Sequence, residues 1–326
     1  MWRGKTLELR HKLLAAQRQG RFAVASSSNE RKALDRRVER GELVSPYFGM
    51  YAYRDYRQHL SKREFALHVL RTAAFLHPDW TFCSFSAALA WGLDVPNSQL
   101  LPLTVGIGPN GHKRRMRGLV QCQCVTDDTP VVMRGVKATS IERTMLDCAC
   151  HGGFRHGLAV CDAALHWKLV TPERFRAYVE HRGKGRHGID AARMVARYMD
   201  GRSENGGESI VRAIIIELGF VIPELQVEVD DPMRPGAPRN VDYYWCLLDG
   251  RVIILELDGL GKYYAGRGRS DAQDVREVAR RMSEERLRES HINLTGATVL
   301  RASFTQATDE AYLFRLLFQA GVPLRS

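Results

Sequence analysis

Apolar residues recur at helical spacing near the start of the chain, and serine and glycine mark where the pattern begins and stops. Residues 6–18 predict one helix, and the serines at 26–28 offer an N-cap for a second helix that ends near Gly41. Residues 43–51 then predict two short strands around a turn. The pattern therefore indicates two helices followed by a small β-hairpin.

The second predicted helix separates its apolar residues from its basic ones. Leu34 and Val38 fall on one face, and the opposite side carries the candidate DNA-binding residues Lys32, Arg36 and Arg40, with Arg37 beside them. A basic helix followed by a hairpin is typical of a winged helix-turn-helix, whose helix enters the major groove while its basic residues neutralise phosphates. The alternative is an ordinary solvated helix face, because lysine and arginine are common on any protein surface.

Residues 61–202 mix helical and strand patterns without a clear catalytic motif. Capping-box sequences at Ser61 and Thr139 predict two helix starts, and a Thr-Pro-Glu sequence at Thr171 predicts a third. Strands are predicted at 101–107, 118–126 and 131–136. We interpret this segment as a mixed α+β connector.

A polar, glycine-rich segment at 200–207 indicates a domain boundary, and helical and strand patterns alternate after it. The predicted elements are a helix at 207–219, a strand at 225–230, a hairpin at 240–258, a long helix from Ser270 to before Gly296, a strand at 297–303 and a helix at 308–320. This order predicts a compact α/β domain. The expected domains are therefore 1–60, 61–202 and 203–326.

Composition and charge predict the cellular location of the protein and two kinds of binding partner. The 326 residues are 44% hydrophobic and 26% charged, which is typical of globular proteins, and no apolar run approaches the ~20 residues of a membrane span. Seven cysteines are too sparse for a secreted disulfide framework, so we expect a cytoplasmic protein. Residues 1–64 hold 15 Lys/Arg against 7 Asp/Glu, whereas residues 203–258 hold 4 against 11. The first segment suits a polyanion such as DNA, and the second suits cations.

The acidic segment contains a hairpin whose turn decides where its carboxylates lie. A two-residue turn ending at Gly250 would place Asp242 opposite Leu257. A three-residue loop with Gly250 in the left-handed conformation would instead place Asp242 opposite Glu256, with Asp258 on the same face. Three crowded carboxylates repel one another, so this arrangement predicts a divalent cation, Mg²⁺ or Mn²⁺. The alternative is three solvated charges at strand ends.

The same residues resemble the core of the PD-(D/E)xK nucleases, and most closely the very-short-patch-repair endonuclease-like proteins. The matching segments are 208–212, Gln226, 241–245, 254–259, 285–289 and 299–301. The resemblance implies that Asp242 and Glu256 bind the metal and that Glu208 supports them. It departs from the signature in one place, because Asp258 stands where the lysine is expected. Lys262 could replace that lysine, although an ordinary exposed loop lysine explains it slightly better.

The N-terminal region separately resembles the winged-helix domain of AbiEi-type antitoxins, through Leu34, residues 41–44 and residues 48–51. Residues 84–93 and 139–147 resemble the connector in such fusions. The predicted fold is thus α/β multidomain, with an N-terminal winged helix, an α+β connector and a restriction-endonuclease-like C-terminal domain.

The resemblances imply a DNA-binding protein with a metal-dependent, endonuclease-like domain that hydrolyses phosphodiester bonds. Its candidate catalytic residues are Glu208, Asp242, Glu256, Asp258 and Lys262. The alternative is a non-catalytic, antitoxin-like transcriptional regulator, which would have a cognate toxin or another protein as its partner. The Glu208–Arg212 spacing has a simpler explanation too, because such pairs are common on helix surfaces.

Overall fold

A computed structural model of the chain describes residues 2–108, 118–124, 129–234, 236, 238–258, 280, 287 and 290–325. It confirms a mixed α/β organisation, and the chain divides into two compact units. The first unit contains residues 1–153 and 173–193, and the second contains residues 154–172 and 194–326. The first unit therefore holds the 1–60 segment together with most of the predicted connector.

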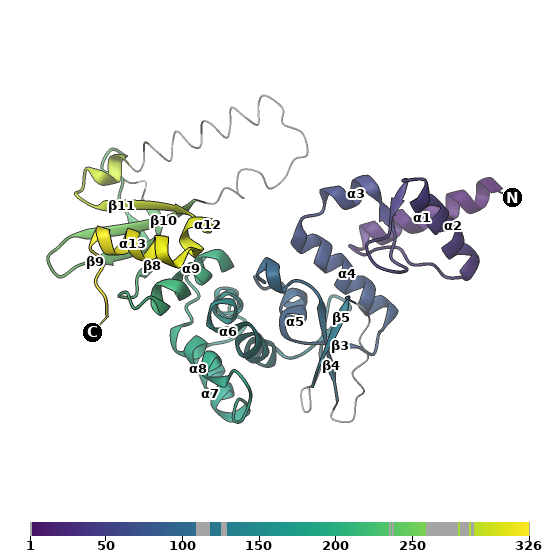
Figure 1. Cartoon of the computed structure of the whole chain (residues 1–326), viewed down its shortest axis with the longest axis horizontal. Helices are drawn as coiled ribbons and strands as arrows, with labels where there is room; N and C mark the ends of the chain where they lie inside the picture. Colours follow the sequence, from purple (N-terminus) through teal and green to yellow (C-terminus); the bar gives the residue numbers. More distant parts are fainter. Residues whose placement is uncertain are drawn as a thin grey trace. The chain divides into compact units, whose positions relative to one another are not determined.

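The first sixty residues fold around a small apolar core of their own. Their elements are α1 (Trp2–Arg18), α2 (Ser28–Glu39), β1 (Leu43–Val44), β2 (Ala52–Tyr53) and α3 (Arg54–His59). The core joins Leu13 of α1, Leu34 of α2 and Leu43 of β1. An isolated bridge between Ala23 and Tyr51 adds a third short segment to the hairpin. Figure 1 shows these elements in purple and dark blue.

Two predicted helix starts are confirmed by their side-chain bonds. The Ser27 hydroxyl accepts from the backbone N–H of Glu30 at the start of α2. The Ser61 hydroxyl accepts from the N–H of Glu64, and the Glu64 carboxylate accepts from the N–H of Ser61 at 2.8 Å. These bonds satisfy N–H groups that a helix leaves without an internal acceptor, so Ser27 and Ser61 determine where α2 and the helix at Lys62–Leu76 begin.

The rest of the first unit is a five-stranded sheet with helices. After α4 (Lys62–Leu76) come β3 (Thr81–Phe82), α5 (Ser84–Trp91), a short 3₁₀ helix (Asn97–Gln99), β4 (Leu103–Ile107), β5 (Val120–Cys124), β6 (Val131–Met133) and β7 (Val136–Ala138). The strand order is β5-β4-β3-β7-β6. The predicted strands at 101–107 and 118–126 correspond to β4 and β5, whereas the single strand predicted at 131–136 is wrong, because a turn at Arg134 and Gly135 divides this segment into the hairpin strands β6 and β7. Helices α6 (Ile141–His166), α7 (Pro172–Arg182) and α8 (Ile189–Tyr198) follow. Helix α6 is interrupted at Gly153, whose backbone is not helical, and its residues after Gly153 belong to the second unit, as do the last residues of α8.

The second unit is built on a four-stranded mixed sheet. It contains α9 (Gly206–Glu217), β8 (Glu224–Val229), β9 (Arg239–Cys246), β10 (Val252–Asp258), β11 (Thr298–Ser303), α12 (Phe304–Thr308) and α13 (Glu310–Ala320). The order is β11-β10-β9-β8, with β10 and β11 parallel and the other pairs antiparallel. The predicted helix at 207–219, the strands and the helix at 308–320 are confirmed, and α12 is a short additional helix that the sequence pattern did not predict. The long helix predicted from Ser270 lies mostly outside the described residues.

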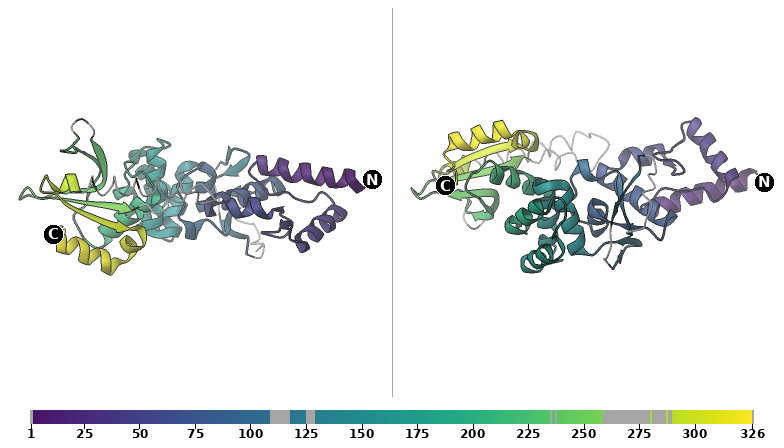
Figure 2. Two further views of the ribbon diagram at one scale, coloured as in Figure 1. Left: turned by 90° about the horizontal axis from the view of Figure 1, so that it is seen from above. Right: turned by 60° about the horizontal axis from the view of Figure 1, so that its bottom comes forward.

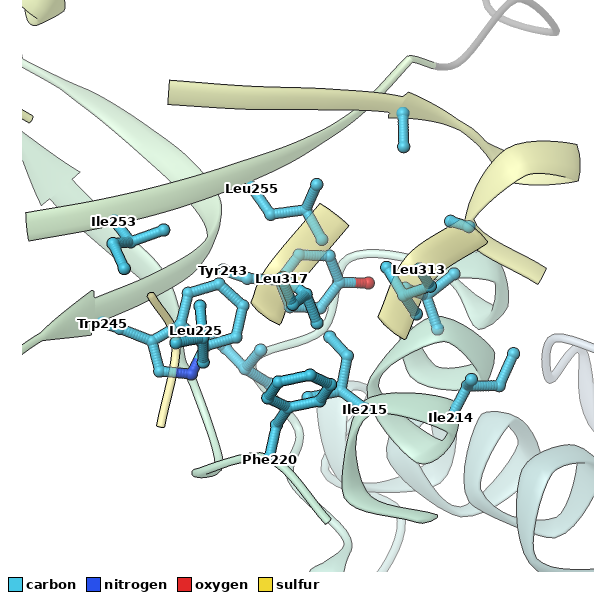
Figure 3. Close-up of a cluster of buried hydrophobic side chains, with 14 residues drawn as sticks. Ile214, Ile215, Phe220, Leu225, Tyr243, Trp245, Ile253, Leu255, Leu313 and Leu317 are labelled. Atoms are coloured by element: carbon cyan, nitrogen blue, oxygen red, sulfur yellow. The ribbon is translucent and has the colours of Figure 1, made fainter. Parts of the chain in front are cut away.

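Helices cover one face of this sheet and enclose its main core. Figure 3 shows Ile215 of α9 and Leu317 of α13 near Tyr243, in the cluster that also contains Leu255. Figure 2 shows α12 and α13, in yellow, along the sheet in both views. A smaller core on the other face joins Val241 and Ile254 to Ile292. In the part of the chain that the structure describes, none of the helices has the length and apolar character needed to cross a membrane.

Candidate functional site

The basic face of α2 lies on the surface of the first unit. Lys32, Arg36 and Arg40 are exposed, whereas Leu34 on the opposite side is only 1% exposed. Arg37 is half-buried, and its Nε lies 3.8 Å from the Glu42 carboxylate. The predicted division of the helix into an apolar and a basic face is confirmed, and three of the four predicted DNA-binding residues form its outer stripe.

Bonds to both neighbouring elements hold α2 in place. The Tyr51 hydroxyl, on the hairpin, donates to Asp35 Oδ1 at 2.6 Å. Burial, together with this carboxylate, raises the pKa of Tyr51, so the phenol stays protonated and keeps donating. Lys12 of α1 lies 2.7 Å from Glu30 in the first turn of α2. The basic stripe is therefore presented by a helix whose position is fixed.

The acidic hairpin has the loop that would bring Asp242 and Glu256 together. The N–H of Leu247 donates to the carbonyl of Arg251 at 2.9 Å, and Gly250 has φ of +84°. Three residues thus form the loop, and the predicted left-handed Gly250 is confirmed. The register pairs Leu255 with Tyr243, the last pair of the ladder, and Glu256 and Asp242 are the next residues on their strands.

Asp242 uses its two oxygens on two different elements. Oδ2 accepts from the backbone N–H of Leu257 on β10 at 2.8 Å, and Oδ1 accepts from Nε2 of Gln226 on β8 at 3.3 Å. The two bonds therefore fix the orientation of the Asp242 carboxylate between β8 and β10. Gln226 must turn its nitrogen to this site, because its other neighbour, Glu208 Oε2 at 3.3 Å, is also an acceptor.

Glu208 is buried at the start of α9 and held by several donors. It is 4% exposed, and its carboxylate accepts from the Glu204 N–H at 2.8 Å and from the Asn205 amide. Asn205 is also the N-cap of the helix, which fixes the first turn. The Tyr243 hydroxyl donates to the Glu208 carbonyl at 2.8 Å. Because of these bonds, Glu208 and Asp242 converge on the Gln226 amide.

In β8 and β9, the side chains before and after Gln226 and Asp242 point to opposite faces of the sheet. Leu225 and Tyr243 are paired and belong to the main core, whereas the next pair, Val227 and Val241, belongs to the smaller core on the opposite face. A regular strand would keep residues two apart on one face. Gln226, between them, has φ of +52°, which is unfavourable for a residue with a Cβ atom. The local strain thus coincides with the convergence of the carboxylates.

A buried ion pair lies behind this site. Arg212 donates to Asp162 Oδ2 at 2.7 Å, and both side chains are at most 3% exposed. Burial raises the pKa of Asp162, and the Arg212 charge and the N–H of Asp200 partly offset this effect. The interpretation of Glu208 and Arg212 as a surface pair is therefore wrong, because neither lies on the surface. Asp162 comes from α6, and the sequence did not indicate it.

The described residues do not complete the predicted metal centre. Asp258 is paired with Arg301 Nε at 3.1 Å, and Lys262 lies outside the described residues. Within the described ranges, no group of three His, Cys, Asp or Glu side chains is placed to hold a metal ion. These residues alone therefore do not fit a divalent cation, and the site of Asp242 and Glu256 stays a prediction.

Comparison with known proteins places the chain in a family without assigning it an activity. No family model matches the sequence. The chain is 32% identical over 216 residues to the uncharacterized protein MT2308 of Mycobacterium tuberculosis strain CDC 1551 / Oshkosh, an alignment that covers 66% of this chain and 74% of that protein. The chain belongs to that protein's family. The uncharacterized protein Rv2248 of M. tuberculosis strain ATCC 25618 / H37Rv matches with the same identity and coverage, so the family extends to both strains.

Proposed function

We propose that the protein binds DNA through the exposed basic face of α2. The observation that supports this most directly is the division of the helix, in which Leu34 is in the core and Lys32, Arg36 and Arg40 are exposed. Basic residues four positions apart lie on one line along a helix, so all three can reach one DNA backbone. The first 64 residues carry a net charge of +8 from 15 Lys/Arg and 7 Asp/Glu, which favours the same partner.

The salt dependence of binding tests this proposal. Fluorescence anisotropy of labelled duplex DNA at a series of salt concentrations gives the log–log slope for the full chain. Substituting Lys32, Arg36 and Arg40 together by alanine removes three phosphate contacts and lowers the slope by about 2.7, at about 0.9 for each contact.

The matched control changes the same charge elsewhere in the first unit. Arg176, Lys184 and Arg193 are also exposed, so their triple alanine variant loses three positive charges without touching α2. We expect it to retain the slope of the parent protein. An equal loss of slope in both variants would show that net charge, and not α2, determines binding.

A second candidate function is metal-dependent hydrolysis of DNA in the second unit. The convergence of Glu208 and Asp242 at a strained Gln226 supports it, because strained residues cluster at functional sites. Incubation of the full chain with supercoiled plasmid and Mg²⁺, Mn²⁺ or a chelator tests it, with Asp242→Asn as the inactive control. Salt-dependent DNA binding without cleavage would favour the alternative, a non-catalytic antitoxin-like regulator with a toxin or other protein partner.

A further inference from the structure

The tip of the N-terminal hairpin presents a phenylalanine to solvent. The N–H of Met50 donates to the carbonyl of Tyr47 at 2.9 Å, which closes a four-residue turn, and Gly49 has the φ of +77° that the third position of a type II turn requires. Phe48 occupies the second position of this turn and is 88% exposed. The turn therefore fixes the backbone on both sides of Phe48.

The hairpin is anchored on either side of this tip. Tyr47 stacks on Phe65 with ring centroids 6.4 Å apart, and Met50 and Tyr51 are at most 2% exposed. Phe48 alone points away from the core. Removing its side chain would therefore leave the packing of the hairpin intact, so the fold gives no reason for an exposed aromatic ring at this position.

The ring lies beside the basic face of α2. The Arg31 guanidinium is 5.6 Å from the Phe48 ring centroid, within the range of a cation–π contact. Arg31 and Lys32 are exposed near the start of α2, and Arg36 is exposed one turn after Lys32. An aromatic ring next to several cations suits a ligand that has both negative charge and flat apolar surfaces. Nucleic acid has both, in its phosphates and its bases.

We propose that Phe48 contacts the bases of bound duplex DNA, inserting its ring at a step that unstacks readily. This inference rests on the proposed DNA binding and adds a role that the basic residues cannot perform, because phosphate contacts carry no sequence information. Apolar wedges of this kind enter between base pairs from the minor groove, and pyrimidine–purine steps open most easily. The favoured substrate is thus duplex DNA with a deformable TA or CA step where the hairpin tip meets it.

The test compares Phe48→Ala with a matched phenylalanine. Phe75 is 56% exposed in the same unit and also has a guanidinium, that of Arg21, 4.1 Å from its ring centroid. We expect Phe48→Ala to weaken the binding of duplex DNA about 5- to 150-fold, with the salt slope unchanged, because a stacking contact releases no counterions. Phe75→Ala binds as the parent does. Phe48→Trp, which keeps a flat ring, restores most of the affinity.

A fluorescent base locates the contact. Duplexes that carry 2-aminopurine at a TA step or within a GC-rich stretch report unstacking through their emission. We expect the parent to change the emission at the TA step and Phe48→Ala to leave it unchanged. Salt-dependent binding with equal affinities for Phe48→Ala and Phe75→Ala would overturn this inference and leave the proposed function intact. Absence of salt-dependent DNA binding by the parent would overturn both.

Discussion

Gln226 donates a hydrogen bond to Asp242 from a backbone that is left-handed, at a nitrogen–oxygen distance of 3.3 Å. The same amide nitrogen lies 3.3 Å from Glu208 Oε2. The amide therefore brings the positive ends of its N–H dipoles to two carboxylates at once and offsets part of their mutual repulsion. These two hydrogen bonds offset part of the energetic cost of the left-handed backbone at Gln226.

We expect Gln226→Leu to destabilise the second unit by about 1–3 kcal/mol, because two carboxylates lose a shared donor. The loss should be smaller in an Asp242→Asn background, in which only Glu208 keeps its charge. Hydrogen exchange at the Leu257 amide, which donates to Asp242, measures the effect in this unit alone. Equal losses in both backgrounds would show that the amide and Asp242 are not coupled.

Removing Arg212 should expose the cost of burying the Asp162 charge. We expect Arg212→Met to destabilise the second unit by about 3–5 kcal/mol near pH 7.5, because it leaves a buried carboxylate without its cation. Burial already raises the pKa of Asp162, and loss of the arginine raises this pKa further. The folded state then binds a proton more readily than the unfolded state, so the deficit shrinks as the pH falls toward 5.

A double substitution separates this charge effect from loss of packing. Arg212→Met with Asp162→Leu removes both charges and should recover most of the stability at pH 7.5. The stability of the second unit is measured by urea unfolding, with hydrogen exchange of the α9 amides as the readout. A double variant as unstable as Arg212→Met, with the same deficit at every pH, would contradict the assignment.

Divalent cations should stabilise the full chain if Asp242 and Glu256 hold a metal ion. Mn²⁺ that binds only the folded state gives about 2.7 kcal/mol at a hundred times its Kd, which appears as a higher Tm. Glu256→Gln should remove most of this shift, whereas Glu228→Gln, at an exposed carboxylate on β8, should keep it. If millimolar Mn²⁺ leaves the Tm of the parent protein unchanged, the result favours the alternative function, a non-catalytic antitoxin-like regulator.

His68 should make the first unit sensitive to acid. Burial lowers its pKa, with Arg71 acting in the same direction and Glu64 partly opposing it, and Tyr56 Oη lies 2.7 Å from Nε2. The unfolded chain takes up the proton first, near pH 6.5, so stability is full above this pH and is lost as the pH falls. We expect His68→Gln to show a smaller drop in Tm between pH 7.5 and 5.5. Parallel Tm profiles for the two proteins would exclude His68 as the cause.

Local rules were sufficient for two helix starts and for the three-residue loop of the acidic hairpin. Ser27 and Ser61 mark the helix starts because their hydroxyls can reach N–H groups only a few residues away. Gly250 fixes the register because the number of loop residues determines which strand positions face each other. Each of these features depends on residues close in the sequence.

The contacts around Glu208 could not be predicted in the same way. Asp162, the partner of Arg212, is 50 residues earlier and lies within residues 61–202, which the sequence pattern assigns to the connector. The left-handed backbone of Gln226 has no signal in the sequence, because glutamine has no preference for that conformation. The change of strand facing at Gln226 also breaks the alternation on which the expectation of a shared carboxylate face rested.

The division of α6 at Gly153 bears on how such a protein can be inherited. Residues 154–172 belong to the second unit and residues 173–193 return to the first, so the polypeptide passes from one unit to the other three times. A gene segment that begins at residue 203 would encode the buried guanidinium of Arg212 without the carboxylate of Asp162. A single crossover that transfers all of the second unit must lie at or before residue 154, and it then carries residues 173–193 of the first unit with it. The two units are expected to spread between genomes, and to be lost from them, as one piece.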